Sequence, residues 1–293
     1  MHSLFILGNG FDLHHGLPTR YTDFMAFMKQ RHPKVARDFI KGVGLYSLHY
    51  WNRMDQITED ILWNDMERIF GSYETMEMAE EHRDWDSSPD YRGPAAKQLR
   101  DILRLPNHIS DYLNEWLAGV EPTLKTLPPK PRLQALFSAP GSLYLNFNYT
   151  TTLESVYGLE PVYHLHGRVG ETLVMGHGQI LGRVQMDPRE YGINVVNEKF
   201  VESSFRASRK NCKKIMKQLP QVFGSSDLGE VSQIFVLGRS LNEIDMPYFR
   251  RIKRLCPKDV QWNIFVLPGQ ENQYLERMRH LPARKEKVTM MQW

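Results

Sequence analysis

The chain has 293 residues, of which 41% are hydrophobic and 24% carry a charged side chain, a composition typical of a soluble protein with a real core. Its formal net charge of +3 is compatible with an anionic ligand and does not by itself indicate nucleic acid. The two cysteines, Cys212 and Cys256, lack the spacing of a metal site, and a disulfide framework is not expected.

The N-terminal segment lacks the basic start of a signal peptide, and no apolar run approaches the length of a membrane span. We therefore expect a protein of the reducing cytoplasm that has no membrane partner.

Short apolar runs recur along the chain and resemble strands that are covered on both faces. The expected strands are 4–7, 143–147, 162–165, 172–175, 234–237 and 264–267. Helical segments separate most of these runs. The sequence thus predicts an α/β fold with an open parallel sheet flanked by helices.

The long segment between the first and second expected strands has helical periodicity. This periodicity is found in 24–28, 57–69 and 99–116. We expect a sheet-bearing core of residues 1–20 and 132–293, and a helical insertion of residues 21–131 that caps the carboxyl edge of the sheet. A polar loop is expected at 86–94, and a proline-rich linker at 122–131 leads back to the sheet.

The first expected strand ends in a glycine turn, Gly-Asn-Gly-Phe-Asp at residues 8–12, and Gly16 follows. A strand that runs into glycines brings backbone N–H groups to the carboxyl edge of a sheet, where a phosphate can approach. The third glycine comes six residues after the second, which departs from the dinucleotide fingerprint. A tight turn without a ligand is the alternative interpretation.

Polar residues follow three further expected strands where each strand ends. They are Asn-Phe-Asn-Tyr-Thr at 146–150, His-Leu-His-Gly at 164–167 and Gly-Arg-Ser at 238–240. Ligands of open parallel sheets bind beyond the carboxyl ends of the strands. We therefore expect these segments and the glycine turn to converge on one crevice.

These strand-end motifs resemble those of sirtuins. The glycine turn is similar to the sirtuin pattern Gly-x-Gly-x₅-Gly-(Ile/Leu)-Pro, which is matched by Gly8, Gly10, Gly16, Leu17 and Pro18. Residues 147–154 resemble the Thr-Asn-Tyr-Asp…Leu-Glu segment of bacterial sirtuin-like domains. The His-Gly pair at 166–167 falls where that fold keeps its active-site His-Gly, and 238–241 with Asp245 is similar to its late nucleotide-contacting turn.

Most of the chain, including Trp-Asn-Asp-Met-Glu at 63–67, resembles the abortive-infection AbiH family of bacterial phage-defence proteins. The two resemblances imply a Rossmann-like, sirtuin-like sheet with a large helical insertion after its first strand. They also imply an antiphage effector that hydrolyses NAD or a related nucleotide. A protein deacetylase is not expected, because the chain lacks the four cysteines of a zinc ribbon.

The sirtuin resemblance also implies residue roles. Asn148 and His166 would be catalytic: the imidazole would deprotonate a ribose hydroxyl or water near neutral pH, and the amide would orient that group. The nucleotide would be bound by Gly8, Asn9, Gly10, Asp12, Gly16, Gly167, Gly238, Ser240 and Asp245. The backbone amides of residues 8–10 would hold the pyrophosphate, and no metal ligand is expected.

Two residues depart from the sirtuin pattern and leave the identity of the nucleotide open. Asp12 stands where sirtuins have a small hydroxyl residue, and Thr150 stands where the related pattern has aspartate. A carboxylate near a pyrophosphate repels it, unless the carboxylate faces a ribose hydroxyl or a metal intervenes. Structural roles are the alternatives for three other residues: His166 as a core histidine, and Asn148 and Asp245 as helix caps.

Two other functions remain open. A nucleotide-binding sensor without catalysis would bind its ligand tightly and not turn it over. A nucleic-acid-directed toxin would use the basic residues of 206–217, with Asp12 as a metal carboxylate, and would bind in a salt-dependent way. The basic clusters at 206–217 and 250–254 also suit solvated helix faces. A phage-derived trigger and a homo-oligomer are the partners that the sequence leaves open.

Overall fold

The computed structural model describes residues 2–40, 101, 104–105, 107–176, 212–239, 241, 245–266, 271–279, 281 and 287–293. The chain divides into two compact units. The sheet unit comprises Met1–Thr19, Leu117–Leu173 and Asn211–Trp293, and the second unit comprises Arg20–Trp116 and Val174–Lys210. Much of the insertion expected at 21–131 lies outside the described residues, so those domain boundaries stay a prediction.

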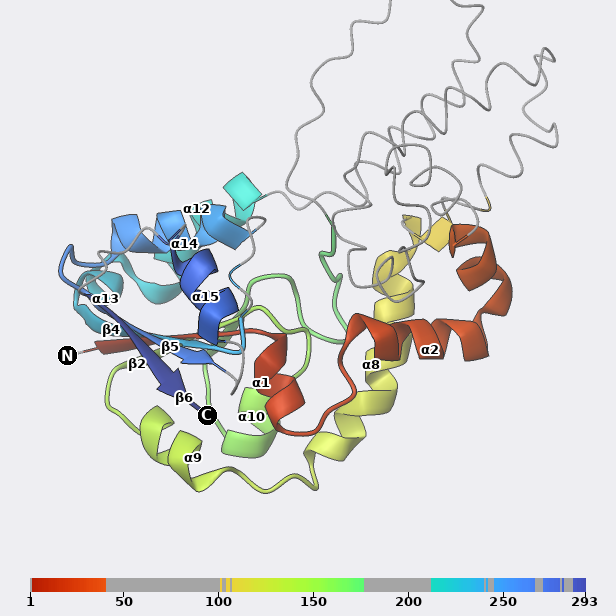
Figure 1. Ribbon diagram of the computed structural model, residues 1–293, viewed down its shortest axis with the longest axis horizontal. Helices are drawn as coiled ribbons and strands as arrows, with labels where there is room; N and C mark the ends of the chain where they lie inside the picture. Colours follow the sequence, from red (N-terminus) through yellow and green to blue (C-terminus); the bar gives the residue numbers. More distant parts are fainter. Residues whose placement is uncertain are drawn as a thin grey trace, which may run out of the picture. The chain divides into compact units, whose positions relative to one another are not determined.

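The sheet unit is built on one parallel sheet of six strands (Figure 1). The strands are β1 (His2–Leu7), β2 (Ser142–Asn146), β3 (Val162–His164), β4 (Val231–Leu237), β5 (Gln261–Val266) and β6 (Val288–Gln292). Their order across the sheet is β3-β2-β1-β4-β5-β6, and every neighbouring pair is parallel. The predicted α/β class with a parallel sheet is confirmed, and the carboxyl ends of all six strands lie at one edge.

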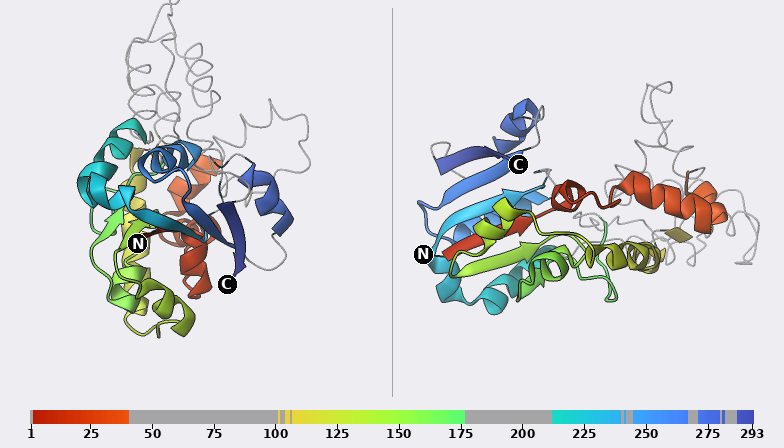
Figure 2. Two further views of the ribbon diagram at one scale, coloured as in Figure 1. Left: turned by 90° about the vertical axis from the view of Figure 1, so that its left-hand side faces the viewer. Right: turned by 90° about the horizontal axis from the view of Figure 1, so that it is seen from below.

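Helices cover both faces of this sheet (Figures 1 and 2). One face packs against α12 (Cys212–Phe223), α13 (Ser225–Gly229), α14 (Met246–Leu255) and α15 (Glu271–Met278). The other face packs against α1 (Asn9–His14), α9 (Pro131–Phe137) and α10 (Thr152–Tyr157). In β1, Leu4 and Ile6 contribute to the first core, while Phe5 and Leu7 contribute to the second. This double burial explains why β1 is apolar throughout.

The second unit contains α2 (Tyr21–Arg31) and the first part of α8 (Ile109–Leu124). The Phe24 ring of α2 lies 5.2 Å from the Trp116 ring of α8, and His32 bonds Glu115 at 2.7 Å. The helix expected from the spacing of residues 24–28 is therefore confirmed. The expected segments 57–69 and 86–94 lie outside the described residues, as does the 63–67 motif.

Two expectations from the sequence are wrong. The run 172–175 is not a strand; its apolar side chains, Leu173 and Met175, are buried in a loop, so their hydrophobicity reflects burial and not pairing. The linker expected at 122–131 begins too early, because Pro122 lies inside α8. Pro131 is the first residue of α9, a position where proline is favoured.

The strand β6 was not expected, because its exposed and half-buried residues do not form a continuous apolar run.

The turns after β1 and β4 pack directly against each other. The Gly8 N–H donates to the Leu237 carbonyl oxygen at 2.9 Å, and the Gly10 N–H donates to the Gly238 carbonyl oxygen at 2.8 Å. Gly238 has a φ of 67°, and a Cβ at this position would lie 2.2 Å from the Phe11 nitrogen. Side chains at these positions would therefore force the two turns apart.

We predict that Gly238→Ala destabilises the protein much more than Gly158→Ala. Gly158 has nearly the same φ, 66°, but a Cβ there would meet no atom within 4 Å. Gly158→Ala should cost only the left-handed strain, about 1 kcal/mol, whereas Gly238→Ala adds a backbone clash and should cost about 3 kcal/mol or more. Urea unfolding measures both values, and equal losses would contradict the packing of the two turns.

Candidate functional site

The polar segments that follow β1, β2, β3 and β4 lie together in the sheet unit. The Asn148 side-chain amide donates to the Gly8 carbonyl oxygen at 3.1 Å, which joins the β1 and β2 ends. The His166 ring after β3 lies edge-on to the Phe147 ring, with centroids 5.5 Å apart. The Arg239 guanidinium after β4 lies over the same Phe147 ring, 4.5 Å from its centroid. The four strand ends therefore contact one another directly, while the expectation that they line one crevice for a ligand stays a prediction.

The Asp12 carboxylate is enclosed by hydroxyl groups. Asp12 is only 1% exposed, and it accepts hydrogen bonds from Thr150 Oγ1 at 2.6 Å and Thr152 Oγ1 at 2.8 Å. Burial raises the pKa of Asp12 from its usual 3.8 to about 6, although the two threonine hydroxyls and Asn148 act in the opposite direction. A carboxyl group with such a shifted pKa is typical of a functional site.

Asp12→Asn should stabilise the protein increasingly as the pH rises. Because the folded-state pKa of Asp12 lies above 3.8, its contribution to stability is complete below pH 3.8 and is lost as the pH passes 6. Asparagine has no such loss and can still bond both threonine hydroxyls. Between pH 4 and pH 8, the unfolding free energy of the variant minus that of the wild type should grow by about 2 kcal/mol.

Urea unfolding across this pH range measures the Asp12→Asn difference, and Asp259→Asn on the exposed surface is the matched control. A constant Asp12→Asn difference would contradict the raised pKa of the carboxyl group.

Asn148 is held in a loop that its neighbour Asn146 organises. Asn146 Oδ1 accepts a hydrogen bond from the Asn148 backbone N–H at 3.0 Å, which is an Asx turn. Asn148 is 7% exposed. The helix that follows, α10, has Thr151 at its N-cap position, so the alternative in which Asn148 caps this helix is wrong.

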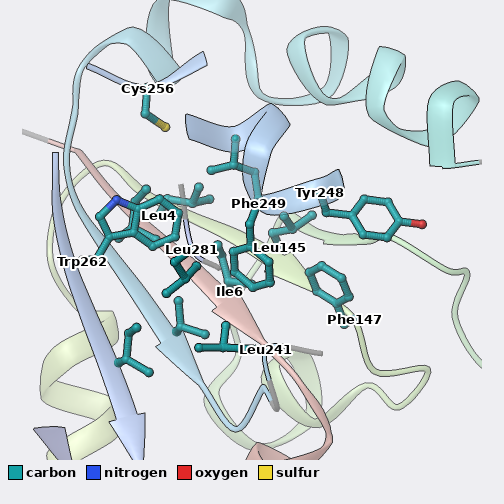
Figure 3. Packing of buried hydrophobic residues seen from close by; sticks show 14 of the residues in the cluster. Leu4, Ile6, Leu145, Phe147, Leu241, Tyr248, Phe249, Cys256, Trp262 and Leu281 are labelled. Atoms are coloured by element: carbon teal, nitrogen blue, oxygen red, sulfur yellow. The ribbon is translucent and has the colours of Figure 1, made fainter. Parts of the chain in front are cut away.

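His166 is 3% exposed and pairs with a buried tyrosine of α14. Its Nε2 atom lies 3.2 Å from the Tyr248 hydroxyl. Burial strongly raises the pKa of Tyr248, and the side chain of Cys212 acts in the same direction, so the phenol keeps its proton. Figure 3 shows the Tyr248 ring at the end of the apolar cluster, next to Phe147, with its hydroxyl pointing away from the aliphatic side chains.

Asp245 forms an ion pair with Arg239, and this pair joins the β4 turn to the start of α14. Asp245 occupies the N-cap position of α14, but its side chain makes no capping hydrogen bond. The alternative that explained Asp245 by helix capping is therefore wrong. Because the Arg239 guanidinium also lies over the Phe147 ring, Asp245 fixes the position of a cation beside the site.

The remaining predicted nucleotide contacts have structural partners. The Asn9 side chain makes two hydrogen bonds with Thr19. Its amide nitrogen donates to the Thr19 carbonyl oxygen at 2.8 Å, and its amide oxygen accepts from the Thr19 hydroxyl at 2.7 Å. Gly16 and Gly167 have φ angles of 77° and 87°, which favour glycine. The N–H groups of Gly8 and Gly10 donate to the carbonyl oxygens of Leu237 and Gly238, so the expectation that these two amides hold a pyrophosphate is wrong. Ser240 lies outside the described residues, and the nucleotide-binding role of the whole set stays a prediction.

Several bonds of this site were not expected from the sequence. Thr152 bonds Asp12, Tyr248 bonds His166, and His164 bridges Glu154 and Asn148. The run of three threonines at 150–152 directly after a strand was the one available signal for Thr152. Tyr248 carried no such signal, because the helix α14, distant in the sequence, brings it to His166. Glu154 lies in α10 directly after β2 and ends the 147–154 motif, but its bond to His164 was not expected.

Among the described residues, no three histidine, cysteine, aspartate or glutamate side chains are grouped so that they could hold a metal ion. The same part of the chain contains no helix long and apolar enough to cross a membrane.

The fold and site define an α/β protein with a parallel sheet and a buried polar cluster at the carboxyl ends of its strands. Residues 4–266 match the model of the family described as Bacteriophage abortive infection AbiH, and the chain belongs to this family. The AbiH resemblance is thus confirmed, and membership indicates a role in antiphage abortive infection. Neither the curated proteins nor the solved structures that were compared match the chain.

Proposed function

We propose that this chain is an abortive-infection effector that binds NAD or a related nucleotide at the carboxyl edge of its sheet and hydrolyses it. The observation that carries the proposal is the meeting of four strand-end segments: Asn148 bonds the glycine turn, His166 contacts Phe147, and Thr150 bonds Asp12. Loss of the nucleotide would stop an infected cell from supporting phage.

The strand order supports a nucleotide site of the Rossmann type. The order β3-β2-β1-β4-β5-β6 is the order of doubly wound dinucleotide-binding sheets. In such sheets the ligand binds where the chain changes direction across the sheet, which here is between β1 and β4. The Gly8–Gly10 turn and the Gly238 turn meet at this point.

The two departures from the sirtuin pattern complement each other. Sirtuins have a hydroxyl residue at the position of Asp12, and the related pattern has aspartate at the position of Thr150. In this chain the two side chains bond each other at 2.6 Å. The carboxylate and the hydroxyl have thus changed places between positions 12 and 150, and a carboxylate–hydroxyl pair is kept. This pairing supports the relation to sirtuin-like domains. The buried Asp12 carboxyl would face ribose hydroxyls in preference to a pyrophosphate.

The proposed reaction is hydrolysis of the bond between ribose and nicotinamide or another base. Breaking this bond builds positive charge on the sugar. The His166 imidazole would take a proton from a ribose hydroxyl or from water, and the Asn148 amide would orient that group. The Tyr248 hydroxyl, 3.2 Å from His166 Nε2, would hold the orientation of the imidazole.

We predict that His166→Ala and Asn148→Ala each lower nucleotide hydrolysis by at least about 100-fold, because each removes a group that acts on the reacting sugar. The purified full chain is incubated with NAD, and nicotinamide release is followed. In parallel, NAD is measured in phage-infected bacteria that express each variant. His108→Ala, whose side chain is 59% exposed, is the matched control and should behave as wild type.

Three outcomes would contradict the proposal in different ways. Hydrolysis that persists unchanged in both variants would remove their assigned roles. Tight NAD binding without turnover, in vitro and during infection, would favour a sensor. Phage protection with unchanged NAD, together with salt-dependent binding to DNA or RNA, would favour a nucleic-acid-directed toxin.

A further inference from the structure

His164, the last residue of β3, bridges two other elements of the site. Its Nδ1 atom lies 2.9 Å from the carbonyl oxygen of Asn148, and its Nε2 atom lies 2.8 Å from Glu154 Oε1 on α10. The side chains of His164 and Glu154 are 6% and 13% exposed, so both contacts are largely shielded from water. One imidazole therefore joins β3, the loop after β2 and α10.

The carbonyl partner of His164 fixes which ring nitrogen donates to Asn148. A carbonyl oxygen only accepts, so His164 Nδ1 must carry the proton in the bond to Asn148. Nε2 lies 2.8 Å from Glu154 Oε1, within hydrogen-bond distance of this carboxyl oxygen. Glu154 thus holds the ring in the orientation in which Nδ1–H points at Asn148.

The backbone of Asn148 is clamped on both sides. Its N–H donates to Asn146 Oδ1 at 3.0 Å, its carbonyl oxygen accepts from His164 Nδ1, and its side chain donates to the Gly8 carbonyl oxygen at 3.1 Å. A loop residue usually has fewer constraints. Loss of the His164 bond would remove one of these three constraints on the residue that carries the amide side chain.

The Glu154–His164 pair connects β3 to α10 at a cost in folding stability. The other carboxylate oxygen, Glu154 Oε2, is buried and has no hydrogen-bond partner within the part of the chain that the structure describes. A buried polar atom without a partner costs stability, and an apolar contact between β3 and α10 would avoid this cost. This cost is consistent with a functional reason for the pair.

We propose that His164 is a positioning residue for Asn148, with Glu154 orienting the imidazole. The inference rests on the proposed function, because Asn148 matters in this way only if its amide acts on a bound nucleotide. His164 itself need not touch the nucleotide. Its role is to fix the peptide that carries the Asn148 side chain.

Two conservative variants separate the two bonds of His164. Asparagine places its amide nitrogen where histidine has Nδ1, so His164→Asn keeps the donor to Asn148 and loses the bond to Glu154. Glutamine places its amide where histidine has Nε2, so His164→Gln keeps the bond to Glu154 and loses the donor to Asn148. A role in positioning and a role in stability therefore predict opposite rankings.

The first measurement is independent of any nucleotide. The side-chain amide resonances of Asn148 are recorded in the full chain by ¹H–¹⁵N NMR and are assigned by their loss in Asn148→Ala. We expect His164→Asn to leave these resonances near their wild-type positions and His164→Gln to shift or broaden them. Urea unfolding of both variants shows how much stability each has lost.

The second measurement is NAD hydrolysis by the same proteins. We expect His164→Asn to keep kcat within about threefold of wild type, and His164→Gln to lower kcat at least tenfold with a smaller change in KM. His108→Gln is the control for the chemical change and should leave both values unaltered. The loss in His164→Gln should exceed what its lower stability explains.

The inference is overturned if His164→Gln leaves the Asn148 resonances unchanged, or if both variants lose kcat in proportion to their loss of stability. If the wild type hydrolyses no nucleotide, the proposed function fails and the catalytic purpose of the clamp fails with it. In that case the NMR measurement still decides whether His164 fixes Asn148, so the two failures are distinguishable.

Discussion

The backbone contact between the turns after β1 and β4 is the constraint on which the site depends. The Gly10 N–H donates to the Gly238 carbonyl oxygen, and neither turn leaves room for a Cβ. This close approach sets where α1 begins, and α1 carries Asp12 to the hydroxyl groups of Thr150 and Thr152. The glycines thus act as packing residues, whatever ligand approaches their turn.

The buried polar side chains around this contact are hydrogen-bonded or ion-paired. Asp12 is bonded by hydroxyls, His166 by the Tyr248 phenol, and Asp245 by the Arg239 guanidinium. Buried polar groups fix a single arrangement when they are paired and destabilise a fold when they are not. The raised pKa of Asp12 shows that burial remains a net cost for its charge. A protein that keeps such groups at the carboxyl edge of a parallel sheet has an arrangement suited to a ligand.

The sequence predicted the parts of the fold that depend on local pattern. Apolar runs indicated β1, β2, β3, β4 and β5. The run in β1 is continuous because this strand is buried on both faces, whereas β3 is short and half-buried. The same rule failed at 172–175, where Leu173 and Met175 are buried in a loop without strand partners. It also missed β6, whose partly exposed residues have no continuous apolar run.

By itself the sequence determined the sheet class, the AbiH membership and the strand-end positions at which polar residues would meet, since these follow from local composition and short motifs. Only the tertiary structure decided which polar groups bond each other. Thr152 reaches Asp12 across 140 positions and Tyr248 reaches His166 across 82, distances in sequence at which no periodicity specifies a partner. Strand order and helix packing set these pairs, because they alone fix which side chains share a buried, water-poor edge.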